Sequence, residues 1–250
     1  LLNSPIAAIY TPFSFILVYE VYLLVYYLPK STALYVSKQY EIITLIIFRR
    51  LFKDLANLNL TANWFENKYD LQFTFDLVTS IALFYLIYLL HLHRSKTYPT
   101  SDISPLARQR ITQFINTKKW IAAALVPTLF FISIFSFLNW ALGVFHISGT
   151  SPIPFKNINN IFFEQFFTIL IIVDVFLLLF SFFHTDDFHK VIRNSGFIVS
   201  TILLRISFAV EGLTNNLLIV AAVLFGLMVV VIHNRFEKKL NLHEIDKAEG

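Results

Sequence analysis

The sequence contains no cysteine and only six glycines among its 250 residues. Without cysteine the chain has no disulfide, no thiolate metal ligand and no cysteine nucleophile. Charged residues are also scarce, because Asp, Glu, Lys and Arg together make up 14% of the chain, against about 25% in an average soluble domain. The glycine-dependent and histidine-dependent motifs GxxxxGK[ST], GxGxxG, GxSxG and HExxH are all missing. No catalytic constellation is evident, and no cofactor is expected.

Apolar residues take the place of the missing charges. Hydrophobic residues make up 56% of the chain, phenylalanine alone supplies 28 of them, and the mean hydropathy is +0.65. This composition excludes a disordered chain and a collagen-like fibre. We predict an all-α integral membrane protein, a polytopic helical bundle that forms one transmembrane domain over residues 1–250. The net charge of +4 and the pI of about 9.2 fit the Lys and Arg excess of cytoplasmic loops, so no nucleic-acid partner is expected.

Six apolar stretches are candidates for membrane spans, because a hydrocarbon core of about 30 Å needs about 20 apolar residues as helix. The predicted spans are residues 6–28, 70–92, 120–145, 161–183, 197–213 and 216–234. The fifth is the shortest, and a turn at Thr214-Asn215-Asn216 is expected to separate it from the sixth. The first residues lack a basic region and a small-residue cleavage site, so no signal peptide is expected.

Two further segments are predicted to be amphipathic helices. The first, residues 31–56, is apolar but basic, and two interpretations remain open. It either lies in the outer interface, which gives six spans, or enters the membrane over residues 40–60, which gives seven. The second, residues 105–117, has Ser104 as a cap and Pro105 at its first position. We expect it to lie on the cytoplasmic face against anionic lipid headgroups.

The distribution of Lys and Arg predicts the orientation. The loops and the tail on one side of the predicted spans carry twelve of these residues, whereas the loop 146–160 and the turn 214–216 carry only Lys156. By the positive-inside rule the C-terminus is then cytoplasmic. We expect a multi-pass protein of the plasma (inner) membrane, with the lipid bilayer and either further copies of itself or other membrane subunits as partners.

Ionisable residues within the spans require an explanation, because each costs about 2.5–3.5 kcal/mol at the centre of a membrane helix. The candidates for buried charges or an ion path are Glu20, Asp76, Asp174, Arg205 and Glu211. Asp174 lies ten residues before His184, and Arg205 lies nine residues after Gly196. If these two spans form a hairpin, both groups reach a similar depth and can pair. The pair would be either structural or part of an ion or proton path.

The remaining charges near the membrane have simpler interpretations. Glu20 is expected to face Arg49 or Arg50, or to be protonated and hydrogen-bonded. Asp76 and Glu211 are expected at the outer boundary as solvated residues. Arg49, Arg50 and Lys53 suggest a voltage sensor, but only the last two have the spacing of three residues, so an interfacial basic face is the favoured interpretation.

Histidines raise the question of a metal site. The weak candidates lie at the cytoplasmic ends of two spans: His91, His93, His184, Asp187 and His189. His and Asp side chains are suitable ligands for a transition metal, but seven histidines are few for a membrane di-metal oxygenase. We expect interfacial residues or helix-end partners rather than a metal centre.

The leading functional hypothesis is a membrane transport component, either channel-like or ion-coupled, whose polar interior contains Glu20, Asp174 and Arg205. The alternative is a non-catalytic transmembrane subunit or scaffold of a larger membrane complex. A membrane enzyme that uses the histidines is the least favoured of the three.

Overall fold

The computed structural model describes Ile16 and residues 19–55, 68–94, 105–146, 156–184, 188–210 and 212–248. All regular secondary structure in these residues is helical, which confirms the predicted all-α class. Residues 19–27 are helical. The longer helices are α2 (Thr32–Leu55), α3 (Lys68–Arg94), α4 (Pro105–His146), α5 (Lys156–His184), α6 (Phe188–Ser207) and α7 (Leu213–Ala248).

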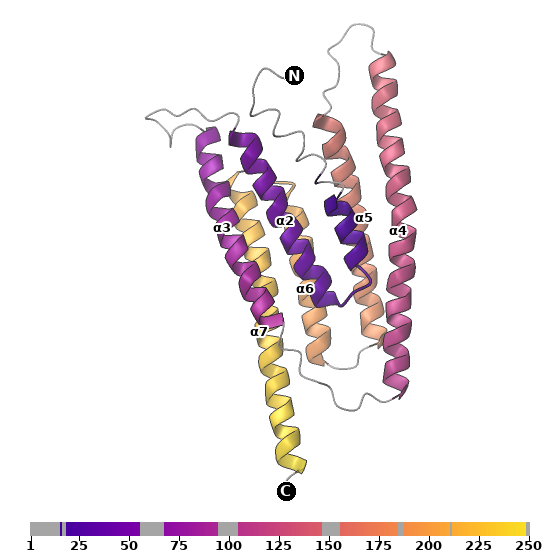
Figure 1. Ribbon diagram of the computed structural model, residues 1–250, viewed down its shortest axis with the longest axis vertical. Helices are drawn as coiled ribbons and strands as arrows, with labels where there is room; N and C mark the ends of the chain where they lie inside the picture. Colours follow the sequence, from indigo (N-terminus) through magenta and orange to yellow (C-terminus); the bar gives the residue numbers. More distant parts are fainter. Residues whose placement is uncertain are drawn as a thin grey trace.

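The long helices run side by side along one axis (Figure 1). Four of them form a closed ring of neighbours, in which α2 packs on α3, α3 on α7, α7 on α6, and α6 on α2. Helix α5 packs on the outside of α6, and α4 packs on α5 at the edge of the bundle. We call the end of the bundle where α5 leads into α6 the α5–α6 end, and the opposite end, where α6 leads into α7, the α6–α7 end.

The centre of the ring is closely packed. The Tyr40 ring of α2 is fully buried, and its hydroxyl lies 2.6 Å from Ser200 Oγ of α6. Ser200 Oγ in turn donates to the Ala222 carbonyl of α7 at 2.6 Å. Gly226 of α7 faces the Tyr40 hydroxyl so closely that a Cβ atom there would overlap it. Three helices therefore meet around one tyrosine.

Helix α2 shows how residues 31–56 are placed relative to the other helices. It lies alongside α3 and α6 in the bundle rather than across its end (Figure 1). Its residues Ile42, Ile43 and Ile47 belong to the buried core. This segment is therefore part of the helical bundle, and its place in the interface or in the membrane stays a prediction.

Two predicted boundaries are wrong. Residues 105–117 are not a separate amphipathic helix, because α4 continues without a break from Pro105 to His146. The fifth predicted span, 197–213, is also displaced, since α6 runs from Phe188 to Ser207. Residues 208–210 and Gly212 lie in turns between the two helices, and Gly212 has a φ of 74° that favours glycine. Asn215 and Asn216 therefore lie in the first turn of α7 instead of in a loop.

Helices cover the other predicted spans, with the reservation that only part of 6–28 is described. Among the described residues, Asp70–Arg94 and Leu213–Lys239 are long and apolar enough to cross a membrane, and Thr168–Ser181 is a shorter apolar helix. Two such helices are weak evidence of membrane association. The number of crossings stays a prediction.

Candidate functional site

Asp174 of α5 and Arg205 of α6 form an ion pair inside the bundle. Arg205 Nη2 donates to Asp174 Oδ2 at 2.8 Å, and both side chains are almost completely buried. Gln39 Nε2 of α2 donates to the same oxygen at 3.4 Å. The expected contact between Asp174 and Arg205 is therefore present. Gln39 was missed, because its position on a basic amphipathic segment gave no sign that it faces the interior.

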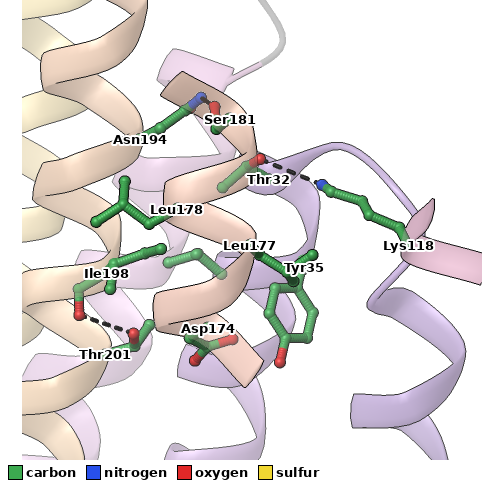
Figure 2. A pocket seen from close by; sticks show the side chains of 11 residues that line it. Thr32, Tyr35, Lys118, Asp174, Leu177, Leu178, Ser181, Asn194, Ile198 and Thr201 are labelled. Carbon is green, nitrogen blue, oxygen red and sulfur yellow. Dashed lines mark hydrogen bonds between the residues drawn. The ribbon is translucent and has the colours of Figure 1, made fainter. Parts of the chain in front are cut away.

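A small cavity lies beside this carboxylate, between α2, α4, α5 and α6 (Figure 2). Its volume is about 20 Å³, which is room for one water molecule. Two buried oxygens near it, Asp174 Oδ1 and the Tyr35 hydroxyl, make no hydrogen bond within the described part of the chain. Buried polar atoms are almost always satisfied in native proteins. The space and the two oxygens together are suited to a bound water or a small cation.

Lys118 of α4 closes one side of the cavity (Figure 2). Its Nζ donates to the Lys30 carbonyl at 3.1 Å and to Thr32 Oγ1 at 3.4 Å. Lys118 lies two residues before the predicted span 120–145. Burial lowers the pKa of its amine to about 8, although the negative charge of Asp174 opposes this shift. The cavity thus has a carboxylate on α5 and an amine of reduced basicity on α4.

A second cluster, which we call the Arg50 clamp, lies toward the α6–α7 end and consists of Arg50, Asp76, Asn215, Asn216 and Gln72. The Arg50 guanidinium binds both carboxylate oxygens of Asp76, with Nη2 at 2.7 Å from Oδ1 and Nε paired with Oδ2. It also donates to Asn215 Oδ1 at 2.9 Å and to Asn216 Oδ1 at 2.6 Å. Gln72 and Asn216 each donate to Asp76 Oδ1 at 2.7 Å. The clamp joins α2, α3 and α7.

The Arg50 clamp corrects two predictions. Asp76 is not a solvated boundary residue, because it is fully buried. Arg49 and Arg50 do not form an outward basic face either, since both point toward acidic residues inside the bundle. Arg49 Nη2 lies 3.3 Å from Oε2 of the buried Glu20, which is one of the partners expected for Glu20. The Lys53 side chain and Glu211 lie outside the described residues.

The histidines do not assemble as the two predicted clusters. His91 Nε2 pairs with Glu41 Oε1 at 3.0 Å, and His93 Nδ1 lies 2.8 Å from the Leu89 carbonyl in its own helix. The His184 side chain and Asp187 are outside the described part. His189 instead stacks on His233 of α7, with ring centroids 5.2 Å apart. The spacing of four residues between His233 and Glu237 places these two side chains on one face of a helix, and this signal was missed, whereas nothing in the sequence indicated the contact between His189 and His233.

The fold and the interior define a class: an all-helical bundle with charged pairs and amide side chains at its centre. Comparison of the chain with protein-family models, with curated proteins and with solved structures gives no match in any of the three.

Proposed function

We propose that this protein is a multi-pass membrane protein of ion-coupled transport, in which Asp174 binds and releases the transported proton or cation. The observation that carries the proposal is the Asp174–Arg205 pair beside a water-sized cavity. Intramembrane charges that pair with one another commonly mark ion pathways and proton relays. The channel-like alternative is less well supported, because a cavity of about 20 Å³ is much smaller than a conducting pore.

The outer surface of the bundle supports a membrane location. Large apolar side chains are exposed along α3 and α4, where Phe84 is 71% and Trp120 is 78% accessible. The exposed row on α3 comprises Leu77, Val78, Ile81, Phe84, Tyr85, Tyr88 and Leu92. Soluble proteins rarely expose apolar patches of this extent. Lipid is a suitable environment for such a surface, and the interior of the same bundle holds the charges.

The proposed mechanism is an exchange of partners at Asp174. Its Oδ2 is held by Arg205 and Gln39, whereas Oδ1 makes no hydrogen bond within the described residues. Because Asp174 lines the cavity, this oxygen can accept a proton or contact a small cation there. Protonation neutralises the carboxylate and removes most of its attraction for the guanidinium. The weakened contact between the two side chains links the occupancy of Asp174 to the packing of α5 against α6.

The orientation proposed for this transporter follows the charge distribution, with the C-terminus and the α5–α6 end in the cytoplasm of a cell bounded by the plasma (inner) membrane. Lys118 and the cavity then lie nearer the cytoplasmic side than the Arg50 clamp does. An ion released from Asp174 toward Lys118 would leave on that side.

Flux measurements in proteoliposomes test the proposal. Wild-type protein should carry protons or monovalent cations above the rate of empty vesicles. Asp174→Asn and Arg205→Leu should each lose this flux, and each single change should also lower stability, because it removes a buried ion pair but only one of its two charges. The double variant should regain a monodisperse folded state but no flux. Glu41→Gln serves as a matched carboxyl-to-amide control and should transport normally, since Glu41 pairs with Lys38 and His91 at the partly exposed face of α2.

Two results would contradict the proposal. Wild-type flux in the folded double variant would show that the pair has only a structural role. If the wild type carries neither protons nor monovalent cations, transport is rejected, and a subunit or scaffold of a membrane complex remains as the proposed function.

That second candidate is favoured by one observation. Tyr19, Tyr22 and Tyr26 form an exposed stacked row, with successive ring centroids 6.4 and 5.8 Å apart. Tyrosine hydroxyls are poorly satisfied in hydrocarbon, so such a row is suited to headgroups or to a partner protein. Loss of a co-purifying membrane partner on replacement of these tyrosines by leucine would support the scaffold function.

A further inference from the structure

Three potential metal ligands from two helices converge at the α5–α6 end. His189 lies in the first turn of α6, and His233 and Glu237 lie one turn apart on the same face of α7. One ligand atom from each of the three side chains lies within 4.8 Å of the other two. This cluster is separate from the Asp174 site and takes no part in the function proposed above.

The chemistry of His233 is suited to metal binding. Its side chain is 4% accessible, and its Nε2 lies 2.8 Å from Arg193 Nη1 and 3.3 Å from Glu237 Oε1. A guanidinium can only donate, so the contact with Arg193 favours the tautomer in which Nε2 is unprotonated and carries the lone pair that a metal requires, although the nearby Glu237 carboxylate would favour a proton on the same nitrogen. The other nitrogen, Nδ1, is buried and makes no hydrogen bond within the described residues.

The Arg193 guanidinium occupies the position at His233 Nε2 that a metal ion would take. It donates to the same nitrogen that a metal would need, and it has an alternative acceptor in Asn194 Oδ1 at 3.3 and 3.4 Å. A metal ion at the cluster would have to displace the guanidinium from His233. Arg193 would then keep a hydrogen-bond partner within its own helix.

We infer that His189, His233 and Glu237 form a binding site for a divalent transition-metal ion of the zinc class, for which Arg193 is an internal competitor. Two imidazoles and one carboxylate are a set that zinc accepts with a further position open. Metal–ligand distances of about 2.0–2.2 Å require the three atoms to approach one another more closely. Rotation of the His189 ring out of its stack on His233 supplies this movement.

The test is a titration of the full-length chain in detergent with Zn²⁺ alone, after purification on an affinity tag that contains no histidine. Co²⁺ is the spectroscopic probe, because its visible spectrum reports the coordination geometry. We expect one site per chain. Glu237→Gln and His189→Asn remove ligands at partly exposed positions and should weaken binding at least about tenfold. His91→Asn, a histidine on α3 that pairs with Glu41, should bind as the wild type does.

A variant of Arg193 provides the most decisive measurement. Arg193→Gln removes a positive charge and a donor from His233 Nε2, so it should tighten Zn²⁺ binding by about tenfold or more. Weaker binding in Arg193→Gln, or unchanged binding in both ligand variants, would overturn the inference. The cluster would then be only a hydrogen bond between Arg193 and His233 with the Glu237 carboxylate beside it. Size-exclusion profiles and helical circular dichroism identify any variant that fails to fold, and His233 is left unchanged because its burial makes it the least tolerant position.

Discussion

At the scale of single residues, the hydrogen bond between Tyr40 and Ser200 has a fixed direction. Ser200 donates its only proton to the Ala222 carbonyl, so the Tyr40 hydroxyl must be the donor to Ser200 Oγ. The chain of donors therefore runs from α2 through α6 to the backbone of α7. Loss of the hydroxyl in Tyr40→Phe leaves Ser200 with its carbonyl partner and should cost only about 1 kcal/mol.

Gly226→Ala should be far more damaging than that. An added Cβ would overlap the Tyr40 hydroxyl, whose ring is enclosed by three helices and has no room to move. We expect a loss of about 3 kcal/mol or more, seen as a lower thermal midpoint in detergent. Gly196→Ala is the graded comparison, because its Cβ would meet the two methyl groups of Val229 at 2.7 and 3.0 Å, which requires a smaller shift than the overlap with Tyr40. Equal midpoints for the two alanine variants would show that the Tyr40 contact is not tight.

Lys118 gives the stability a pH dependence of defined sign. Its pKa is 10.5 ordinarily and about 8 in the folded protein. Between these values the unfolded chain holds the proton and the folded chain does not, so stability rises with pH, by at most about 1.4 kcal/mol per unit. Denaturation midpoints between pH 8 and 10 should show this rise in the wild type. Lys118→Met should abolish it, and Lys119→Met, an exposed neighbour, should retain it.

At the scale of helices, the sequence allowed one contact of the candidate site to be predicted. Asp174 and Arg205 lie on consecutive helices that are separated by only residues 185–187 in the sequence, so their distances from this segment determine their relative depth. The Arg50–Asp76 contact could not be predicted in this way. Its helices are joined by a longer segment, and the charges of α2 gave no indication of which face is buried. The asparagines that complete the clamp were assigned to a turn, because the left-handed conformation of Gly212 moves that turn upstream.

The Arg50 clamp should make α2, α3 and α7 interdependent. Arg50→Met leaves the buried Asp76 carboxylate without its cation and should cost about 3–5 kcal/mol. Asp76→Asn in the same chain should restore much of this loss, since an amide can still accept from Gln72 and Asn216. Thermal midpoints of the two single variants and the double variant provide the measurement. Losses that simply add would mean that the two side chains do not interact.

At the scale of the whole molecule, composition predicted an all-α membrane protein. The described residues confirm the all-α class, and the multi-pass membrane topology stays a prediction. Burial of polar residues was predicted only where an ionisable group interrupted an apolar stretch. Tyr35, Lys118 and Gln39 were missed, since their burial depends on how α2, α4 and α5 pack together. The number of spans was also beyond the reach of the sequence, because residues 31–56 suit an interface and an interior equally well.

The orientation of the molecule can be tested with reporter fusions. Twelve Lys and Arg residues on one side of the predicted spans should hold that side in the cytoplasm. Reporters placed at Gly250 and near Thr150 should therefore be labelled from opposite sides, with Gly250 inside. Labelling of both from the same side, or with Gly250 outside, would overturn the proposed topology and the direction of ion release inferred from it.

The apolar exterior also has a calorimetric consequence. When a soluble protein unfolds, its apolar core meets water, which produces a large heat-capacity increment and a curved dependence of stability on temperature. In the proposed bilayer the side chains on the outside of α3 and α4 contact hydrocarbon before and after the helices separate. Separation then exposes little apolar surface to water, so the heat-capacity increment should be small. The bundle should gain stability almost linearly on cooling, with no maximum near room temperature.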